Sequence, residues 1–82
     1  MRNTIVFKSN GIFFHKEKRN WKRNTCRKVE AEDFRWNELI RIVQKGPSTN
    51  DYIRIINVDT KESFLRKIQD VSLWEGIFII SW

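Results

Sequence analysis

Short apolar runs alternate with polar clusters in the first third of the chain, a pattern typical of strands joined by turns. Residues 4–7 form a β-branched and aromatic run that predicts a first strand. The Ser-Asn-Gly sequence at 9–11 predicts a turn, because Asn and Gly adopt positive φ at little cost. The apolar residues 12–14 predict a second strand, or a continuation of the first after a bulge. Residues 15–22 are polar and basic and predict an exposed loop, and residues 24–29 predict a further strand.

A helix is predicted between residues 32 and 45 from the period of its apolar positions. Residues at i, i+3, i+4 and i+7 form one apolar stripe on such a helix: Trp36, Leu39, Ile40 and Val43. The acidic pair Glu32-Asp33 suits the positive end of the helix dipole. Gly46-Pro47 supplies a glycine C-cap and a residue that cannot continue the helix, so the helix is expected to end there.

The last third of the chain predicts strands only. Residues 52–58 are rich in Ile and indicate a buried strand, and residues 59–62 are a plausible hairpin turn. Residues 63–71 predict a second strand, and residues 74–76 a further turn. Residues 77–82 are apolar at nearly every position, so this final strand is expected to lie centrally in a sheet or to close a barrel.

These elements predict a mixed α+β fold that is mainly β, with four to six strands and one helix inserted after the early strands. The chain has 82 residues, which is the size of one domain, so we expect a single domain over residues 1–82. A short chain can protect the edges of its strands by curving the sheet into a partly closed barrel. The expected architecture is therefore a small β-barrel or a strongly curved sheet.

The composition excludes several classes of protein. Aromatic residues make up 13% of the chain, which is too much ring surface for a disordered protein. The single cysteine, Cys26, excludes a disulfide framework and a cysteine-based zinc site, and is expected to be a small buried residue. With His15 as the only histidine, no metal or other cofactor is expected. No apolar run approaches the about 20 residues of a membrane helix, and no signal peptide is visible, so we expect a cytoplasmic protein without a membrane partner.

Positive charge is concentrated at the start of the chain. The net charge is +6, and residues 1–28 contain nine Lys and Arg against one Glu, whereas residues 29–82 contain seven cations and nine anions. A local positive field attracts polyanions. The expected partner is nucleic acid, RNA before DNA, or a nucleotide-like ligand. Two alternatives stay open: an acidic protein, as for a small phage-type or mobile-element product, and a solvated basic loop with no such partner.

The basic region combines three kinds of recognition group. An aromatic ring can stack on a base, cations can meet phosphates, and amide or hydroxyl groups can bond base edges. In a strand over residues 24–29, alternate side chains share one face, so Thr25 and Arg27 lie together. The predicted ligand-binding residues are Lys16, Lys18, Arg19, Trp21, Lys22, Arg23, Asn24, Thr25, Arg27 and Lys28. The alternative is a basic loop followed by an edge strand, with Trp21 packed on the core.

This stretch resembles the signature of the ASCH family, a branch of the PUA-like β-barrels. The family motif is a Gly-x-Lys-type loop that enters a strand with a polar residue and then an Arg. Lys22 and Arg27 match the Lys and Arg at the same five-residue separation, and Thr25 falls where many members have Glu. The glycine before the Lys is replaced here by Asn20-Trp21, and the usual Gly-Asp before the next strand by Asn50-Asp51.

The resemblance implies a PUA-like domain with a cleft that binds RNA or a nucleoside-like ligand and is lined by Lys22, Thr25 and Arg27. The small acetylcytidine amidohydrolases of this family carry Thr at the position of Thr25, which implies a third function, hydrolysis of a modified nucleoside. Lys22, Thr25 and a distant carboxylate, with Glu75 as candidate, would then form an activated-nucleophile arrangement. We expect binding rather than catalysis, because binding requires only the charge asymmetry and an aromatic ring.

Overall fold

The computed structural model describes residues 2–20 and 22–82. Within these residues the elements follow in the order β1 (Asn3–Ser9), α1 (Gly11–Lys18), β2 (Asn24–Lys28), α2 (Phe34–Lys45), β3 (Asp51–Asn57), β4 (Ser63–Lys67), β5 (Asp70–Trp74) and β6 (Ile77–Ser81). The predicted mixed α+β fold with mainly β-structure is confirmed. The described residues contain two helices where the sequence predicted one.

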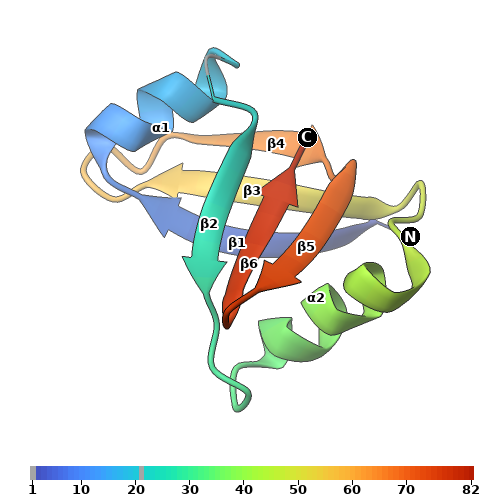
Figure 1. Ribbon diagram of the computed structural model, residues 1–82. Helices are drawn as coiled ribbons and strands as arrows, with labels where there is room; N and C mark the ends of the chain where they lie inside the picture. The colour runs from blue at the N-terminus through green and yellow to red at the C-terminus, as the bar shows by residue number, and fades with distance from the viewer. Residues whose placement is uncertain (1, 21) are drawn as a thin grey trace.

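The strands form two three-stranded sheets and do not close into one barrel. The first sheet has the order β1-β3-β4, with β1 parallel to β3, and the second has the antiparallel order β2-β6-β5. In Figure 1 the strands of the second sheet cross over those of the first, α1 lies near the start of β2, and α2 lies beside β5. The central position predicted for the final strand is confirmed, because β6 is flanked by β2 and β5.

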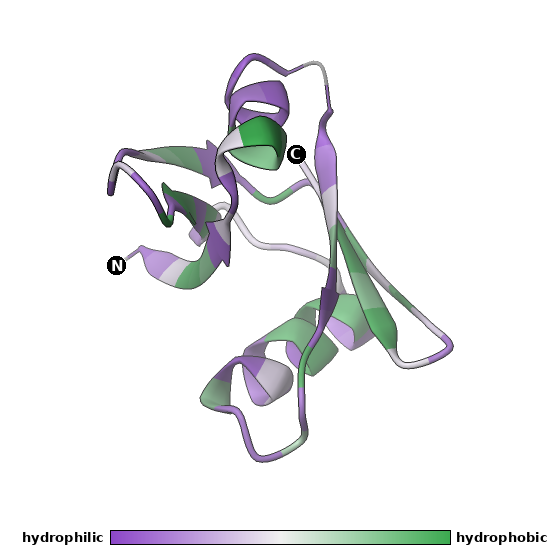
Figure 2. Cartoon of the chain, turned by 90° about the vertical axis from the view of Figure 1, so that its left-hand side faces the viewer, coloured by the Kyte–Doolittle hydropathy of each residue, from purple (hydrophilic) through white to green (hydrophobic). Residues whose placement is uncertain are grey.

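The core lies between the sheets and is built from alternating positions. Ile5 and Phe7 of β1 are buried and pair with the buried Ile53 and Ile55 of β3, as expected for strands with one face on the core. The other buried apolar residues come from both helices, the connecting segments and the remaining strands: Phe14, Val29, Leu39, Ile42, Phe64, Ile68, Val71, Phe78 and Ile80. Figure 2 shows hydrophobic residues along the strands and α2, and a mostly hydrophilic loop between β2 and α2.

The strand predicted over residues 12–14 is wrong, because this segment opens helix α1. The side chain of Asn10 is the N-cap and accepts a hydrogen bond from the backbone N–H of Phe13 at 3.2 Å. Of the three apolar residues only Phe14 is buried, and Phe13 is 48% exposed. The helix extends to Lys18, so the first half of the predicted loop is helical as well.

The single strand predicted over residues 63–71 is divided between the two sheets. The backbone N–H of Ile68 donates to Asp51 of the first sheet, and that of Gln69 donates to Ser81 of the second. The chain therefore changes its hydrogen-bonding partner between two consecutive residues. A hydrophobic pattern alone does not mark such a change, because Ile68 is buried as it would be in one continuous strand.

The predicted helix over residues 32–45 is confirmed as α2. Asp33 is its N-cap and accepts from the N–H of Arg35 at 2.9 Å, and Gly46 ends it with φ of 80°. Leu39 and Ile42 are fully buried against the core. Among the described residues, no helix has the length and apolar character needed to cross a membrane.

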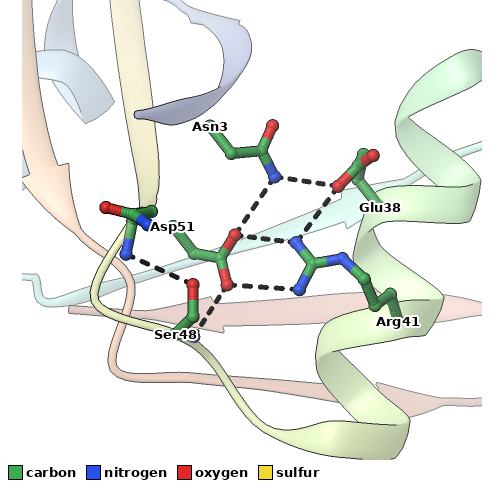
Figure 3. A network of polar contacts seen from close by, with 6 residues as sticks. Asn3, Glu38, Arg41, Ser48 and Asp51 are labelled. Atoms are coloured by element: carbon green, nitrogen blue, oxygen red, sulfur yellow. Dashed lines mark hydrogen bonds and ion pairs between the residues drawn. The ribbon is translucent and has the colours of Figure 1, made fainter. Parts of the chain in front are cut away.

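A polar network joins α2 to the start of the first sheet (Figure 3). The carboxylate of Asp51 is only 1% exposed and accepts hydrogen bonds from Arg41 at 2.7 Å, from the N–H of Ser48 at 2.8 Å and from Asn3 at 3.1 Å. Glu38 of α2 accepts from Asn3 and Arg41 in turn. Burial alone would raise the pKa of Asp51, but these hydrogen bonds outweigh it and lower the pKa from 3.8 to about 2.

We expect Asp51→Asn to lower the free energy of unfolding by about 2 kcal/mol at pH 7. The folded-state pKa of Asp51 lies below its unfolded value, so the stabilisation is complete above the unfolded pKa and is lost as the pH falls from about 4 towards 2. Urea unfolding of both proteins across this pH range measures the difference. Asp70→Asn, at an exposed carboxylate on β5, is the matched control. A difference for Asp51→Asn that is the same at pH 2.5 and pH 7 would contradict the assignment.

Candidate anion-binding site between the two sheets

Arg27 of β2 joins the second sheet to the first. Its Nε donates to Thr25 Oγ1 on the same strand at 2.8 Å. Its Nη1 donates to the carbonyl oxygen of Lys8 at 2.6 Å, and its Nη2 donates to Ser9 Oγ at 2.5 Å. The guanidinium thus spans from an edge strand of one sheet to the end of β1 in the other. Three of its five N–H groups are used, so two remain for a ligand.

Arg27 lines a first hollow of about 320 Å³. This volume is near the lower end of the range found for small-molecule sites, about 300–1,000 Å³. Its wall is formed by the end of β1 and by α1, through Lys8, Ser9, Asn10, Phe13 and Glu17, and on the other side by Lys22, Thr25, Cys26 and Arg27. The hollow therefore combines cations, hydroxyl groups, a carboxylate and one partly exposed aromatic ring.

Glu17 of α1 is buried in the wall of the first hollow. The side chain is 1% exposed, and its Oε1 accepts a hydrogen bond from Ser9 Oγ at 2.9 Å. Its Oε2 is buried and has no hydrogen-bond partner. Ser9 therefore connects Glu17 to the guanidinium of Arg27. A buried carboxylate oxygen without a donor is energetically costly, so this one marks a place where a donor is missing.

Arg27 also lines a second hollow of about 440 Å³. Lys8 and Arg27 belong to both hollows, and Lys28 and Arg35 add their charges to the second. The guanidinium of Arg35 donates to the carbonyl oxygen of Val6 at 2.8 Å and pairs with Asp33. The two hollows together bring five cationic side chains to one surface, from β1, β2, α2 and the loop that precedes β2: Lys8, Lys22, Arg27, Lys28 and Arg35.

The electrostatics of this surface favour an anion. Burial lowers the pKa of the Arg27 guanidinium; the nearby Glu17 opposes this shift, and Arg35 adds to it. Arg remains charged despite such a shift. Lys28 has only a 4.0 Å contact with Glu30, in which both side chains are largely exposed, and such a pair contributes little. No ion pair involves Lys8 or Lys22 within the described part of the chain.

Four of the predicted binding residues lie together at the two hollows: Lys22, Thr25, Arg27 and Lys28. The alternation predicted for this strand is confirmed, because Thr25 and Val29 are buried and Cys26 and Lys28 are exposed. Thr25 is 3% exposed and is part of the wall of the first hollow, and its hydroxyl accepts the hydrogen bond from Arg27 Nε. Cys26, expected to be buried, is exposed and lines the first hollow.

The other predicted binding residues lie elsewhere. Arg23 lines a third hollow of about 220 Å³ with Arg66, Lys67 and Trp82. Lys16, Lys18 and Arg19 are exposed on α1 and its C-cap, and Asn24 is exposed at the start of β2; none of these four lines the three hollows. Lys18 pairs with Glu62 of the β3–β4 turn. Trp21 lies outside the described residues.

The carboxylate proposed for a hydrolytic arrangement is not near Thr25. Glu75 lies in the turn between β5 and β6, whereas Thr25 pairs with Ile80 of β6. Five strand positions at about 3.3 Å each separate Glu75 from Ile80 along the chain. The structure therefore does not bring Glu75 to Lys22 and Thr25, although Lys22 and Thr25 line the same hollow.

Several further residues at the hollows were not predicted from the sequence as binding residues, among them Lys8, Ser9, Phe13, Glu17 and Arg35. The alternation of β1 could have predicted that Ser9 is buried, because Ser9 lies on the same face of the strand as Ile5 and Phe7. Glu17 follows Phe14 by three positions and therefore shares its buried helix face, but that signal requires α1 to be recognised first.

Comparison of the chain with protein-family models, with curated proteins and with solved structures gives no match. The site is therefore interpreted from its own geometry. Among the described residues, no group of three or more His, Cys, Asp or Glu side chains is placed to hold a metal ion. The donors that line the hollows are mainly cations and hydroxyl groups, which suit a phosphate or another oxyanion.

We expect Arg27→Ala to lower the free energy of unfolding by about 2 kcal/mol, because it removes three hydrogen bonds and leaves polar partners at Lys8, Ser9 and Thr25 unpaired. The control is Lys28→Ala, the next residue on the exposed face of the same strand, with an expected effect within about 0.5 kcal/mol. Thermal and denaturant unfolding measure both changes. Equal stabilities of the two variants would show that Arg27 does not hold the sheets together.

Proposed function

We propose that this protein binds single-stranded nucleic acid, RNA in preference to DNA, across the two hollows that flank Arg27. The observation that carries the proposal is the shared wall: Lys8 and Arg27 line both hollows, so the cations form one continuous basic surface. Successive phosphates of a single strand require such a track of positive charge rather than one isolated cation.

The first hollow also supplies groups that suit a base and a ribose. Phe13 is 48% exposed, and an exposed ring is a stacking platform for a base. The ammonium group of Lys22 lies 5.2 Å from the centre of that ring, where it can meet the phosphate of a stacked nucleotide. The hydroxyl groups of Ser9 and Thr25 can exchange hydrogen bonds with a ribose 2′-OH, the group that distinguishes RNA from DNA.

The shape of the surface favours nucleic acid over an acidic protein. Protein interfaces usually have a well-packed apolar centre with charges at the rim. Here the cations line concave surfaces together with hydroxyl groups, and Phe13 is the one aromatic side chain among the described residues of the first hollow. The binding experiment below distinguishes nucleic acid from an acidic protein partner.

Two sequence predictions enter the proposal unchanged. The resemblance to the ASCH family supports a nucleic-acid ligand through Lys22, Thr25 and Arg27, and membership of that family stays a prediction. A cytoplasmic location is also part of the proposal. Its support is the exposed thiol of Cys26, which suits a reducing compartment.

The test is the salt dependence of binding to a fluorescent single-stranded RNA octamer. With about three phosphates neutralised, the logarithm of the association constant should fall with the logarithm of the salt concentration with a slope of about −2. Lys8→Ala, Lys22→Ala and Lys28→Ala should each weaken binding and reduce this slope by about 0.7, uniformly across sequences. Fluorescence anisotropy at salt concentrations from about 50 to about 200 mM measures the slope.

The matched control is Lys45→Ala, which removes one positive charge at the end of α2. Lys45 is exposed and precedes the segment that binds Asp51, at the opposite end of the first sheet from Ser9. Its loss should leave the affinity within about twofold at physiological salt, since ten helix positions, about 15 Å, separate Lys45 from Arg35 at the second hollow and the Debye length is about 8 Å. Equal losses for Lys45→Ala and Lys22→Ala would contradict a localised site. Failure to bind RNA together with capture of a nuclease-insensitive acidic protein would replace the proposal.

A further inference from the structure

Glu17 is unusual in a site built for an anion. Its carboxylate lies in the wall of the first hollow among Lys8, Lys22 and Arg27, and a negative charge there weakens the attraction of a phosphate. Its Oε1 is held by Ser9, and its buried Oε2 has no donor. Phosphate binding alone therefore does not account for Glu17. A ligand that pairs Glu17 as well as the cations presents hydrogen-bond donors together with negative charge.

A nucleotide meets both requirements, with donors on its base and charge on its phosphate. We propose that the first hollow selects guanine, with Glu17 accepting hydrogen bonds from the N1–H and the N2 amino group of the base. This inference rests on the proposed binding of single-stranded RNA and names the base that the site prefers. Oε2 has almost no accessible surface in the unliganded protein, so binding requires the Glu17 side chain to turn about its soft terminal torsion until a carboxylate oxygen reaches the hollow.

Guanine is the common base with two adjacent donors on its Watson–Crick edge. Adenine and cytosine each present one amino group beside a ring-nitrogen acceptor, and uracil presents one N–H between two carbonyl oxygens. A carboxylate repels those neighbouring acceptors. The guanine O6, next to its N1–H, needs a donor, and the two unused N–H groups of Arg27 supply one.

The remaining walls of the hollow fit the same ligand. Phe13 is half exposed, and the purine packs against the part of its ring that Lys22 leaves open. The volume of about 320 Å³ is sufficient for a single nucleotide rather than for a duplex. A base must therefore enter unpaired, which is consistent with a single-stranded partner.

The experiment compares RNA octamers that differ at one central position. The probes are U8 and the four octamers in which one central uridine is replaced by guanosine, inosine, adenosine or cytidine. Inosine keeps N1–H and O6 but lacks the N2 amino group. We expect the guanosine octamer to bind about tenfold more tightly than U8, the inosine octamer to fall between them, and the other two to remain within about twofold of U8.

Glu17→Gln tests the carboxylate itself. The substitution keeps the size of the side chain and an oxygen for Ser9, so we expect the fold to persist, with circular dichroism and thermal unfolding as the check. Loss of the negative charge raises affinity for every octamer, so the readout is the ratio of guanosine to U8, which should fall below about twofold. Lys45→Ala should keep the full ratio.

The outcomes separate the two proposals. Equal affinity for all five octamers with the salt slope retained overturns the guanine inference and leaves the proposed function standing. A preference for adenosine or cytidine, or a guanosine preference that survives in Glu17→Gln, also overturns it. Absence of salt-dependent binding to every octamer overturns the proposed function together with the inference. The inosine arm needs no protein variant, so it remains informative if Glu17→Gln does not fold.

Discussion

The guanidinium of Arg27 is the contact on which the site depends. It joins the two sheets, whose strands do not pair with each other. The contact lies at the end of β1, where the chain leaves the first sheet. Because Arg carries several donors in a rigid plane, one side chain bonds Thr25, Lys8 and Ser9 at once. Arg27 also lines both hollows, so the side chain that connects the sheets belongs to both parts of the basic surface.

Two buried carboxylates lie at opposite ends of the first sheet and are satisfied to different degrees. Both oxygens of Asp51 accept hydrogen bonds, from Asn3, Arg41 and the N–H of Ser48, and this arrangement lowers its pKa to about 2. Glu17 has one hydrogen bond, from Ser9, and one oxygen without a partner. A fully paired carboxylate stabilises a fold, whereas a half-paired one beside a hollow costs stability. Asp51 is therefore a structural group, whereas Glu17 has an oxygen free to accept from a ligand in the proposed site.

The sequence predicts most elements but not how they meet. The period of residues in α2 and the apolar runs of β1, β3 and β6 are strong local signals. The helix α1 was missed because its apolar residues mimic a strand although only Phe14 is buried. On β2, alternation correctly put Thr25 and Arg27 on one face. Lys8 and Ser9 come from another sheet, and no local pattern encodes a contact between residues 18 positions apart.

Positive charge and concave shape have separate consequences for a polyanion. The exposed cations of α1, such as Lys16, act through water, where their field decays within a Debye length of about 8 Å. They can raise the rate of encounter but hold no particular group. Lys22 and Arg27 lie in the walls of a hollow, where the dielectric response is weaker and each contact is stronger. Counting charges along the chain gives both sets equal weight. Only the fold shows which cations share a wall with Glu17, and in the proposed site that carboxylate is the group that would discriminate among bases.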